Sequence, residues 1–414
     1  MFTVLMIDKY YFIKGGAERY VFDLTAALER HGHRVVPFSM QHGHNRKTPY
    51  ASFFVRPIEF HVRGIRKIFA ALSIASRVLY SFHAQRKLAR LIRRVRPDIA
   101  HVHMIDHQIS PSVLHVLRRF RIPVIQTVHQ YKLICPNYRL YNMRTRMICE
   151  KCLDRKFWHP VAERCHMDSI SAGLLLALEA CLHRILKIYE RHVDVFHVPS
   201  RFMGSKLEEG GFPAGRIRHL FYTIDMEQYR ESRGSRDYFL YYGRLSGEKG
   251  IGTLLRAMKN IPRSTLVIAG DGELRGELEE AVRRERIGNV RFSGYLAGEE
   301  LRKMISLSRF VVVPSEWYEN SPLTVYEAFA LGKPVIGSAI GGIPELVIHG
   351  RTGLLFNPGD AETLTRHVLY LLDHPGRAVQ MGKRARKSAE NWFDPENHYE
   401  AMMRIYQQAS GKTG

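Results

Sequence analysis

The chain has 414 residues, of which 45% are hydrophobic and 25% are charged, and its formal net charge is +22. This length exceeds what one hydrophobic core usually organises, so we expect two domains in a soluble globular protein. No apolar run approaches the ~18 residues that a membrane-spanning helix needs. The N-terminus reads as a first strand and lacks the basic start and cleavage site of a signal peptide, so we expect a cytoplasmic location.

The positive charge is concentrated in the first half of the chain. Residues 1–200 hold 32 Lys and Arg against 14 Asp and Glu, which accounts for 18 of the 22 excess charges. A field of this sign attracts phosphates on nucleic acid, on anionic lipid or on a lipid-linked substrate. The alternative is that these charges only keep the surface solvated.

The chain opens with the pattern of a strand–loop–helix unit. An apolar strand is predicted over 3–7, a helix over 19–31 and a second strand over 34–39, which is typical of a parallel sheet. Gly15 and Gly16 in the first loop would let the backbone approach a phosphate or an acceptor. Alone, however, a Gly-Gly pair usually just marks a turn.

The next segment, residues 53–96, combines apolar and basic side chains and predicts two helices rich in Arg and Lys. Segments of this composition can lie on an anionic membrane surface. The alternative is that their apolar stripe packs into the core and their charges are simply exposed. Strands are predicted next over 98–103 and 123–129, and His129 closes the second, where open parallel sheets bind ligands. A lone histidine there is more often structural.

An insertion at about 134–168 contains four cysteines. Cys149 and Cys152 form a tight pair of the kind that binds metal, and Cys135 and Cys165 lie on either side. Four thiolates at this spacing predict a structural zinc site, whereas the alternative is four free thiols. Disulfides are not expected in a cytosolic chain.

The first half ends with an amphipathic helix over 171–189, which Glu179 and His183 interrupt, and with strands near 193–200 and 216–221. A linker then runs from 222 to about 237. The second half restarts the alternation of strands and helices.

A basic loop follows the first strand of the second half, which is predicted over 238–245. Arg244 and Lys249 would neutralise the charge of a departing diphosphate, because both carry a positive charge and no proton needs to be transferred to the leaving group. The alternative is a solvated basic loop. Further along, a strand over 290–296 carries Gly294 and Tyr295, which we expect to border a nucleobase.

Residues 310–338 read as strand, loop, helix, turn and strand. Ser321 is the predicted N-cap of a helix over 323–331, with Pro322 at its first position. The amide groups of Leu323 and Thr324 at that helix start would suit a diphosphate.

Two carboxylates flank this helix start. Glu319 in the preceding loop can accept hydrogen bonds from sugar hydroxyls, and Glu327 on the helix can bind a second diol such as a ribose. The two acids therefore fit a nucleotide sugar. The alternative is one surface glutamate and one that stabilises the helix.

Two motifs of the second half resemble signatures of the retaining glycosyltransferases of family 4. Glu319 and Glu327 occupy the acidic positions of the E-x7-E motif, with Pro-Ser before it and E-A-x-A-x-G-x-P-V from the second acid onward. Arg244 and Lys249 match G-R-L-x-x-x-K-G, whose two cations contact the donor phosphates. One departure is that Asn-Ser-Pro at 320–322 stands where many members have Gly-Phe-Gly, which affects the expected donor preference.

The resemblance, carried mainly by residues 195–390, implies an α/β protein of GT-B architecture, in which two Rossmann-like domains with parallel sheets face a central cleft. We expect an acceptor-binding domain at 1–221 and a nucleotide-sugar-binding domain at 222–390. A C-terminal helix at 391–414 would cross back to the first domain.

The implied activity is transfer of a hexose from a UDP- or GDP-type sugar to a saccharide or lipid-linked acceptor, with retention of configuration, in polysaccharide or glycoconjugate synthesis. No catalytic metal is expected, and membrane-bound acceptors favour peripheral contact with the inner face of the cell membrane. The expected catalytic residues are Glu319, Lys249, Arg244 and His129, because a histidine at this strand end commonly reaches the donor sugar in the family. The residues expected to bind the donor or border the reaction centre are Gly15, Gly16, Gly294, Tyr295, Ser321, Leu323, Thr324 and Glu327.

Two alternatives stay open. One keeps the fold but makes the protein a phosphorylase or a nucleotide-sugar hydrolase or epimerase. The other is a basic nucleic-acid-binding protein with a zinc module. The second explains the charge and the four cysteines, but it leaves the linked cations and acids of the second half unexplained, so we do not expect a nucleic acid partner.

Overall fold

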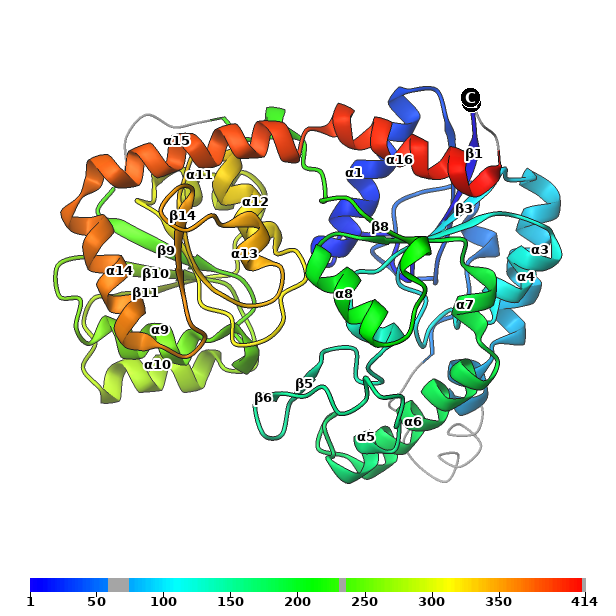
Figure 1. Cartoon of the computed structure of the whole chain (residues 1–414), viewed down its shortest axis with the longest axis horizontal. Helices are drawn as coiled ribbons and strands as arrows, with labels where there is room; N and C mark the ends of the chain where they lie inside the picture. The colour runs from blue at the N-terminus through cyan, green and yellow to red at the C-terminus, as the bar shows by residue number, and fades with distance from the viewer. Residues whose placement is uncertain (59–73, 231–235, 412–414) are drawn as a thin grey trace. The chain divides into compact units, whose positions relative to one another are not determined.

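The structure is a computed structural model in which residues 1–58, 74–230 and 236–411 are described (Figure 1). The chain divides into two compact units. Unit 1 comprises Met1–Arg144, Cys149–Tyr222 and Glu396–Gly414, and unit 2 comprises Thr145–Ile148 and Thr223–Pro395. Each unit is built on a six-stranded parallel sheet, which confirms the predicted α/β class with two Rossmann-like halves.

The sheet of unit 1 has the strand order β2-β1-β3-β4-β7-β8. The strands are β1 (Thr3–Ile7), β2 (Arg34–Phe38), β3 (Ile99–Val102), β4 (Val124–Thr127), β7 (Val195–Val198) and β8 (Ile217–His219). Most of their residues are buried, as expected for parallel strands covered on both faces. The order reverses between β1 and β3, so the loops after these two strands border the position where such sheets bind ligands.

The helices of unit 1 include the predicted first helix, which begins three residues earlier than expected. They are α1 (Gly16–Arg30), α3 (Phe82–Val95), α4 (Val113–Arg119), α5 (His159–Ala162), α6 (Ile170–Ile185), α7 (Ile188–His192), α8 (Arg201–Glu209) and α16 (Pro395–Ser410). The second basic helix predicted within 53–96 is α3, whereas much of the first falls on residues 59–73, outside the described residues. The single helix predicted over 171–189 is instead broken into α6 and α7, because Lys187 adopts a left-handed φ of 48°.

The last helix returns to unit 1. Tyr20 of α1 is hydrogen-bonded to His398 of α16 at 3.0 Å, and His101 of β3 is hydrogen-bonded to Tyr406 at 2.7 Å. These buried pairs join residues more than 300 positions apart, so helix α16 contributes to the core of the first unit. Within the insertion, β5 (Tyr141–Asn142) and β6 (Met147–Ile148) form a two-stranded ribbon.

The sheet of unit 2 has the strand order β11-β10-β9-β12-β13-β14. The strands are β9 (Tyr238–Tyr242), β10 (Thr265–Ala269), β11 (Val290–Gly294), β12 (Val311–Val313), β13 (Val335–Ser338) and β14 (Gly353–Phe356). The helices are α9 (Ile251–Met258), α10 (Arg275–Arg284), α11 (Gly298–Leu307), α12 (Leu323–Ala330), α13 (Ile343–Leu346), α14 (Ala361–Asp373) and α15 (Pro375–Trp392). This order is that of the dinucleotide-binding fold, and it reverses between β9 and β12.

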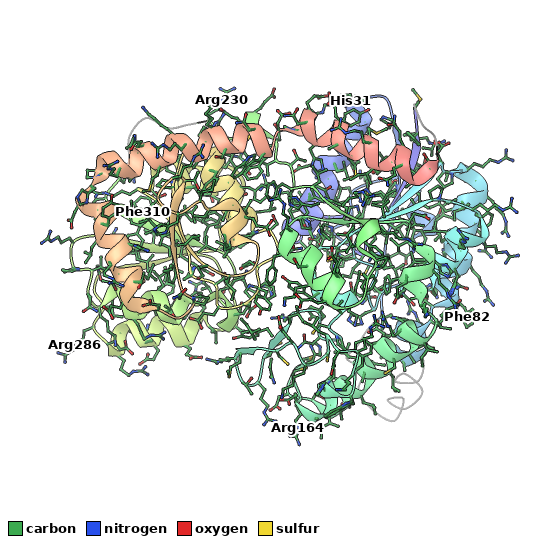
Figure 2. All side chains as sticks on the ribbon, in the orientation of Figure 1. His31, Phe82, Arg164, Arg230, Arg286 and Phe310 are labelled. Carbon is green, nitrogen blue, oxygen red and sulfur yellow. The ribbon has the colours of Figure 1, made fainter. Side chains whose placement is uncertain are left out.

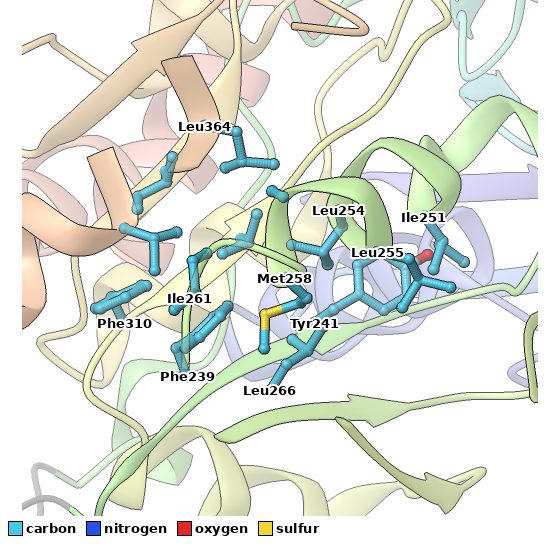
Figure 3. Close-up of a cluster of buried hydrophobic side chains, with 14 of the residues drawn as sticks. Phe239, Tyr241, Ile251, Leu254, Leu255, Met258, Ile261, Leu266, Phe310 and Leu364 are labelled. Carbon is cyan, nitrogen blue, oxygen red and sulfur yellow. The ribbon is translucent and has the colours of Figure 1, made fainter. Parts of the chain in front are cut away.

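The core of unit 2 is apolar and closely packed. Leu254 and Met258 of α9 belong to one buried cluster with Phe239 of β9 and Leu266 of β10 (Figure 3). This packing anchors the strands whose ends carry the candidate site. No described helix is both long and apolar enough to cross a membrane.

The start of α12 differs from the prediction. The N-cap is Pro322, and no side chain caps the helix. Ser321 was predicted as the capping residue, but its hydroxyl instead shares a hydrogen bond of 2.6 Å with the Tyr326 hydroxyl. The prediction was wrong because a buried phenol within reach offers Ser321 a partner that local sequence rules do not include.

Candidate active site

Glycines allow the loops at the carboxyl edge of the unit 2 sheet to pack closely against one another. Gly250 follows the loop after β9 and has a φ of +67°, and a Cβ added there would collide with the Pro314 carbonyl after β12. Gly270, at the end of β10, lies equally close to the Gly243 carbonyl. Only residues without a side chain allow backbones to approach this closely. The loops at the strand reversal are therefore held in direct backbone contact.

This contact places a cation against an acid. Lys249, in the turn Gly247–Lys249 after β9, donates a hydrogen bond of 2.6 Å to Oε1 of Glu319 in the loop after β12. The Ser315 hydroxyl donates to the same oxygen at 2.6 Å. Lys249 Nζ also lies 5.0 Å from the centre of the Trp317 ring. The Glu319 residue is only 6% exposed, so the pair is largely shielded from water.

The charge state of Glu319 follows from these neighbours. Burial by itself raises the pKa of the Glu319 carboxyl, but the Lys249 charge and the hydrogen bonds from Lys249 and Ser315 outweigh burial and hold its pKa below the ordinary value. Glu319 is therefore an ionised acceptor at neutral pH. It can receive hydrogen bonds from hydroxyl groups as well as from the Lys249 side chain beside it.

The backbone of Glu319 is held by the turn after β13. The Gly342 amide donates to the Glu319 carbonyl at 2.7 Å. Gly341 has a φ of +59°, and a Cβ added there would collide with the Glu319 backbone. The pair Gly341 and Gly342 thus sets the position of the acid.

We expect Gly341→Ala to lower kcat/KM for sugar transfer by about tenfold or more, since misplacing a site group by ~1 Å can cost about a hundredfold. Initial rates at several donor concentrations check this. Gly350→Ala is the matched control, because Gly350 also has a positive φ of +74° but open space around its added Cβ. Equal activity of the two variants would show that the turn does not position Glu319.

The second acid lies on α12. Glu327 is 7% exposed, and its Oε1 accepts a hydrogen bond of 3.1 Å from the Tyr229 hydroxyl. At the start of this helix, the Tyr242 hydroxyl donates to the Thr324 carbonyl at 2.8 Å. Within the described residues, the amides of Leu323 and Thr324 donate no hydrogen bond to another backbone group. Such first-turn amides can bind an anion.

The other predicted residues of unit 2 lie along the same edge. Arg244 is exposed and makes no ion pair within the described part of the chain, while its carbonyl accepts a 2.8 Å hydrogen bond from the Tyr241 hydroxyl. Gly294 ends β11 with a φ of +73°, and Tyr295 after it is 75% exposed. The structure thus brings Lys249 and Glu319 into contact and leaves Arg244 and Tyr295 accessible.

Unit 1 carries polar groups at its own strand reversal that the sequence analysis missed. Gly15 and Gly16 are exposed at the start of α1, and the buried Asp8 directly follows β1. Burial, and next the nearby Glu18 carboxylate, raise the pKa of Asp8 to about 8. Lys9 instead pairs with Asp106 at 2.9 Å. A polar residue directly after a buried strand was the available signal for Asp8.

His129 belongs to unit 1 and to a buried histidine network. Its Nδ1 is hydrogen-bonded to the Tyr222 hydroxyl at 2.6 Å and its Nε2 to His103 at 2.9 Å. A parallel chain joins His101, Thr127 and His197 through hydrogen bonds of 2.7 and 2.9 Å. Both ring nitrogens of His129 are thus engaged within the unit.

We expect unit 1 to lose stability as the pH falls below about 6.5. Burial above all lowers the pKa of five histidines, His101, His103, His129, His197 and His398, the third and fifth to about 3. Below pH 6.5 these histidines bind protons in the unfolded chain but not in the folded chain. The free energy of unfolding therefore falls by about 1.4 kcal/mol for each unit by which the pH decreases, for each such histidine. Asp8 and Glu18, whose pKa values are raised, act in the opposite direction but are fewer than the five histidines.

Urea unfolding at pH 7, 6 and 5, with hydrogen exchange resolved by peptide, measures this effect. Peptides of unit 1 should lose protection at lower urea as the pH falls. A flat midpoint in unit 1 across this range would contradict the expected role of the histidines.

The predicted zinc site is not formed in the structure. Among the described His, Cys, Asp and Glu residues, no group of three is arranged to hold a metal ion. Cys135 donates its thiol to the Asn137 side chain at 3.0 Å, and burial together with the neighbouring cysteines raises the pKa of the Cys152 and Cys165 thiols. The cysteines come near enough to raise one another's pKa, as the spacing predicted, but the described residues do not present the arrangement of three or more ligands that a zinc site needs.

Both units match known family profiles. The profile described as Glycosyltransferase Family 4 matches residues 14–228, and that described as Glycosyl transferases group 1 matches residues 225–388. The chain belongs to glycosyltransferase family 4. The resemblance inferred from the two motifs is therefore confirmed, and so is the assignment as a glycosyltransferase.

Relatives of this family 4 glycosyltransferase cover between 73% and 97% of it in the two comparisons given next. It is 26% identical over 431 residues to the glycogen synthase of Mycobacterium tuberculosis, across 97% of this chain and 94% of that protein. It is 26% identical over 311 residues to the sulfoquinovosyl transferase SQD2 of Arabidopsis thaliana, across 73% of this chain and 55% of that protein. These relatives transfer different sugars by their names, so the family alone does not identify the sugar.

Solved structures of similar fold include two full-length matches. Sucrose-phosphate synthase from Thermosynechococcus elongatus has a TM-score of 0.72 at 21% identity and covers 100% of both chains. The Anabaena protein HepE in complex with UDP-glucose has a TM-score of 0.68 at 16% identity, with 99% of this chain and 100% of that chain covered. At these identities the likeness shows the GT-B fold of the glycosyltransferase.

Proposed function

We propose that this family 4 glycosyltransferase moves a hexose from a nucleotide-diphosphate sugar to a saccharide or lipid-linked acceptor, with retention of anomeric configuration. Its role would be polysaccharide or glycoconjugate synthesis at the inner face of the cell membrane. The observation that supports this best is the contact of Lys249 with Glu319 at the strand reversal of unit 2, beside the start of α12.

Arg244 and Lys249 would bind the donor diphosphate. Cations placed where negative charge develops stabilise the transition state without reorganising, which is the main requirement when a diphosphate leaves. The Leu323 and Thr324 amides would add the positive end of a helix dipole. The departing phosphate would accept the proton of the attacking acceptor hydroxyl, so no separate base is required of the chain.

The two acids would bind the donor hydroxyls. Glu319 is ionised and held in place by Ser315 and Gly342, so it suits the hexose. Glu327, oriented by Tyr229, suits the ribose. A UDP-type donor is favoured over GDP because similar solved structures contain UDP or UDP-glucose.

A thermal-shift screen with UDP, GDP, ADP and their common hexose conjugates tests the donor class. A ligand bound only by the folded state stabilises it by about 2.7 kcal/mol at a hundred times Kd. We expect stabilisation by uridine nucleotides, its loss in Glu327→Gln, and no loss in the control Glu362→Gln, which is an exposed glutamate on α14. Absence of any nucleotide shift would count against the proposal.

Product analysis then separates the reactions that share this fold. A transferase releases nucleotide in proportion to acceptor consumed, whereas a hydrolase releases free sugar at the same rate without acceptor. A phosphorylase would need inorganic phosphate. Retention is read from the anomeric configuration of the glycoside by NMR.

A further inference from the structure

Helix α6 buries two polar side chains, Glu179 and His183, against unit 1. Glu179 is 0% exposed and accepts a hydrogen bond of 2.6 Å from Lys132 Nζ. His183, one turn later, is 6% exposed and is hydrogen-bonded to the Leu79 carbonyl at 3.0 Å. The face of α6 that packs on unit 1 therefore carries its charged and hydrogen-bonding groups.

The opposite face of α6 is apolar and open. Ile170, Leu174, Leu178 and Ile185 are 51%, 49%, 52% and 76% exposed, and Cys181 between them is exposed too. Spacings of four, four and seven place these residues along one stripe of the helix. The buried side of α6 also carries Leu176 and Ala177, so the helix is apolar on both sides and leaves one apolar stripe uncovered.

Apolar side chains continue beyond both ends of this stripe. Trp158 in the preceding insertion is 58% exposed, and Met167 just before α6 is 68% exposed. Phe82, 64% exposed, follows three residues after Leu79, whose carbonyl is bound by His183 near the other end of the helix. Figure 2 shows Phe82 pointing outward from unit 1. The apolar surface is therefore larger than one helix.

The surroundings of this surface are basic. Helix α3, which begins at Phe82, carries five basic residues and no acidic one. Exposed basic residues of the insertion and its flanks that belong to unit 1 are Arg144, Lys151, Arg155, Lys156, Arg164 and Lys187. A second copy of this chain would bring the same sign of charge to the surface and be repelled, whereas an anionic bilayer would be attracted.

We infer that the apolar face of α6, formed by Ile170, Leu174, Leu178, Cys181 and Ile185, docks on an anionic lipid bilayer. This names the element that would make the membrane contact in the proposed function, on which it rests. At 16 residues α6 rises ~24 Å, less than the ~30 Å of a hydrocarbon core. With Glu179 held inside unit 1, the helix would lie in the headgroup region and not cross.

Vesicle flotation of the full-length protein tests this inference. The vesicles are phosphatidylcholine alone or with about 30% phosphatidylglycerol, in about 0.1 and 0.5 M NaCl. We expect binding to the anionic vesicles that weakens with salt, and a loss on the order of tenfold per leucine in Leu174→Gln/Leu178→Gln. Val379→Gln, which changes a 59% exposed residue on α15 of unit 2, should bind as the original protein does.

A second measurement leaves the helix unmutated, in case the double variant does not fold. Cys181 is the exposed cysteine of the five, so an environment-sensitive fluorophore can be attached to it. Its emission should shift to the blue on adding anionic vesicles. No shift, no flotation of the original protein, or equal flotation of the double variant would overturn the inference. So would a dimer in light scattering that the double variant dissolves, since the occupant would then be a second copy.

The docking inference and the proposed function can be tested independently of each other. Flotation needs neither donor nor acceptor, and transfer to a soluble acceptor should be unchanged in Leu174→Gln/Leu178→Gln. If the original protein floats but shows no transfer with any nucleotide sugar, the docking inference stands and the proposed function does not.

Discussion

Replacing Lys249 by Ala is expected to lower kcat for sugar transfer by about 10²–10³-fold, the usual effect of removing one group that stabilises charge in a transition state. Lys249 stands against Glu319 and next to the start of α12, where a leaving diphosphate would gain its charge. Initial-rate measurements with saturating donor and acceptor check this, and a similar loss is expected for Glu319→Gln.

The control separates catalysis from folding. Lys259 of unit 2 pairs with Glu285 at 2.7 Å on the surface, where its side chain is 47% exposed, so Lys259→Ala removes an ion pair away from the site. It should keep full activity. A purely structural role for Lys249 predicts a lower melting temperature with an unchanged kcat at low temperature, and full activity in both site variants would remove the basis of the proposed function.

Replacing Glu179 by Ala is expected to destabilise unit 1 by about 3–5 kcal/mol, because removing one partner of a buried pair leaves the other charge uncompensated. Glu179 is fully buried, and the Lys132 side chain against it is only 9% exposed. Burial raises the pKa of Glu179, but its neighbours, Lys132 above all, more than compensate and lower it, so Glu179 is ionised at neutral pH.

Chemical denaturation with hydrogen exchange resolved by peptide measures this loss in unit 1. Glu163→Ala is the matched control, since Glu163 pairs with an exposed Lys151 and such pairs contribute little. The double variant Lys132→Met/Glu179→Leu should regain most of the stability, because it removes both charges at once. Equal stability of the two single variants would contradict the assigned role of the buried pair.

Local patterns in the sequence determined most of the architecture. Short apolar runs separated by turns and amphipathic helices predicted both parallel sheets, because a strand covered on both faces has no polar alternation to show. The motifs around Lys249, Glu319 and Glu327 identified the candidate site of unit 2. They could do so because the residues that bind a ligand at strand ends lie in the loops and the helix start that directly follow the strands, so a local motif contains them.

Contacts between residues far apart in the chain were decided only by the tertiary structure. Tyr229 reaches Glu327 across 98 positions, and the partners that engage both nitrogens of His129 lie at 103 and 222. No local pattern encodes such pairs, since any of the many tyrosines or histidines could fill the role. The cysteine spacing likewise predicted proximity but not the geometry that a zinc ion needs.

Helix α6 was predicted from the sequence, but its orientation was decided by the tertiary structure. Its period in the sequence predicted an amphipathic helix interrupted by Glu179 and His183, but periodicity does not say which face points inward. Partners at Lys132 and Leu79 decided it. A buried charge without a partner costs more than exposed leucines do, so the specific polar contacts set the orientation and the apolar stripe was left outside.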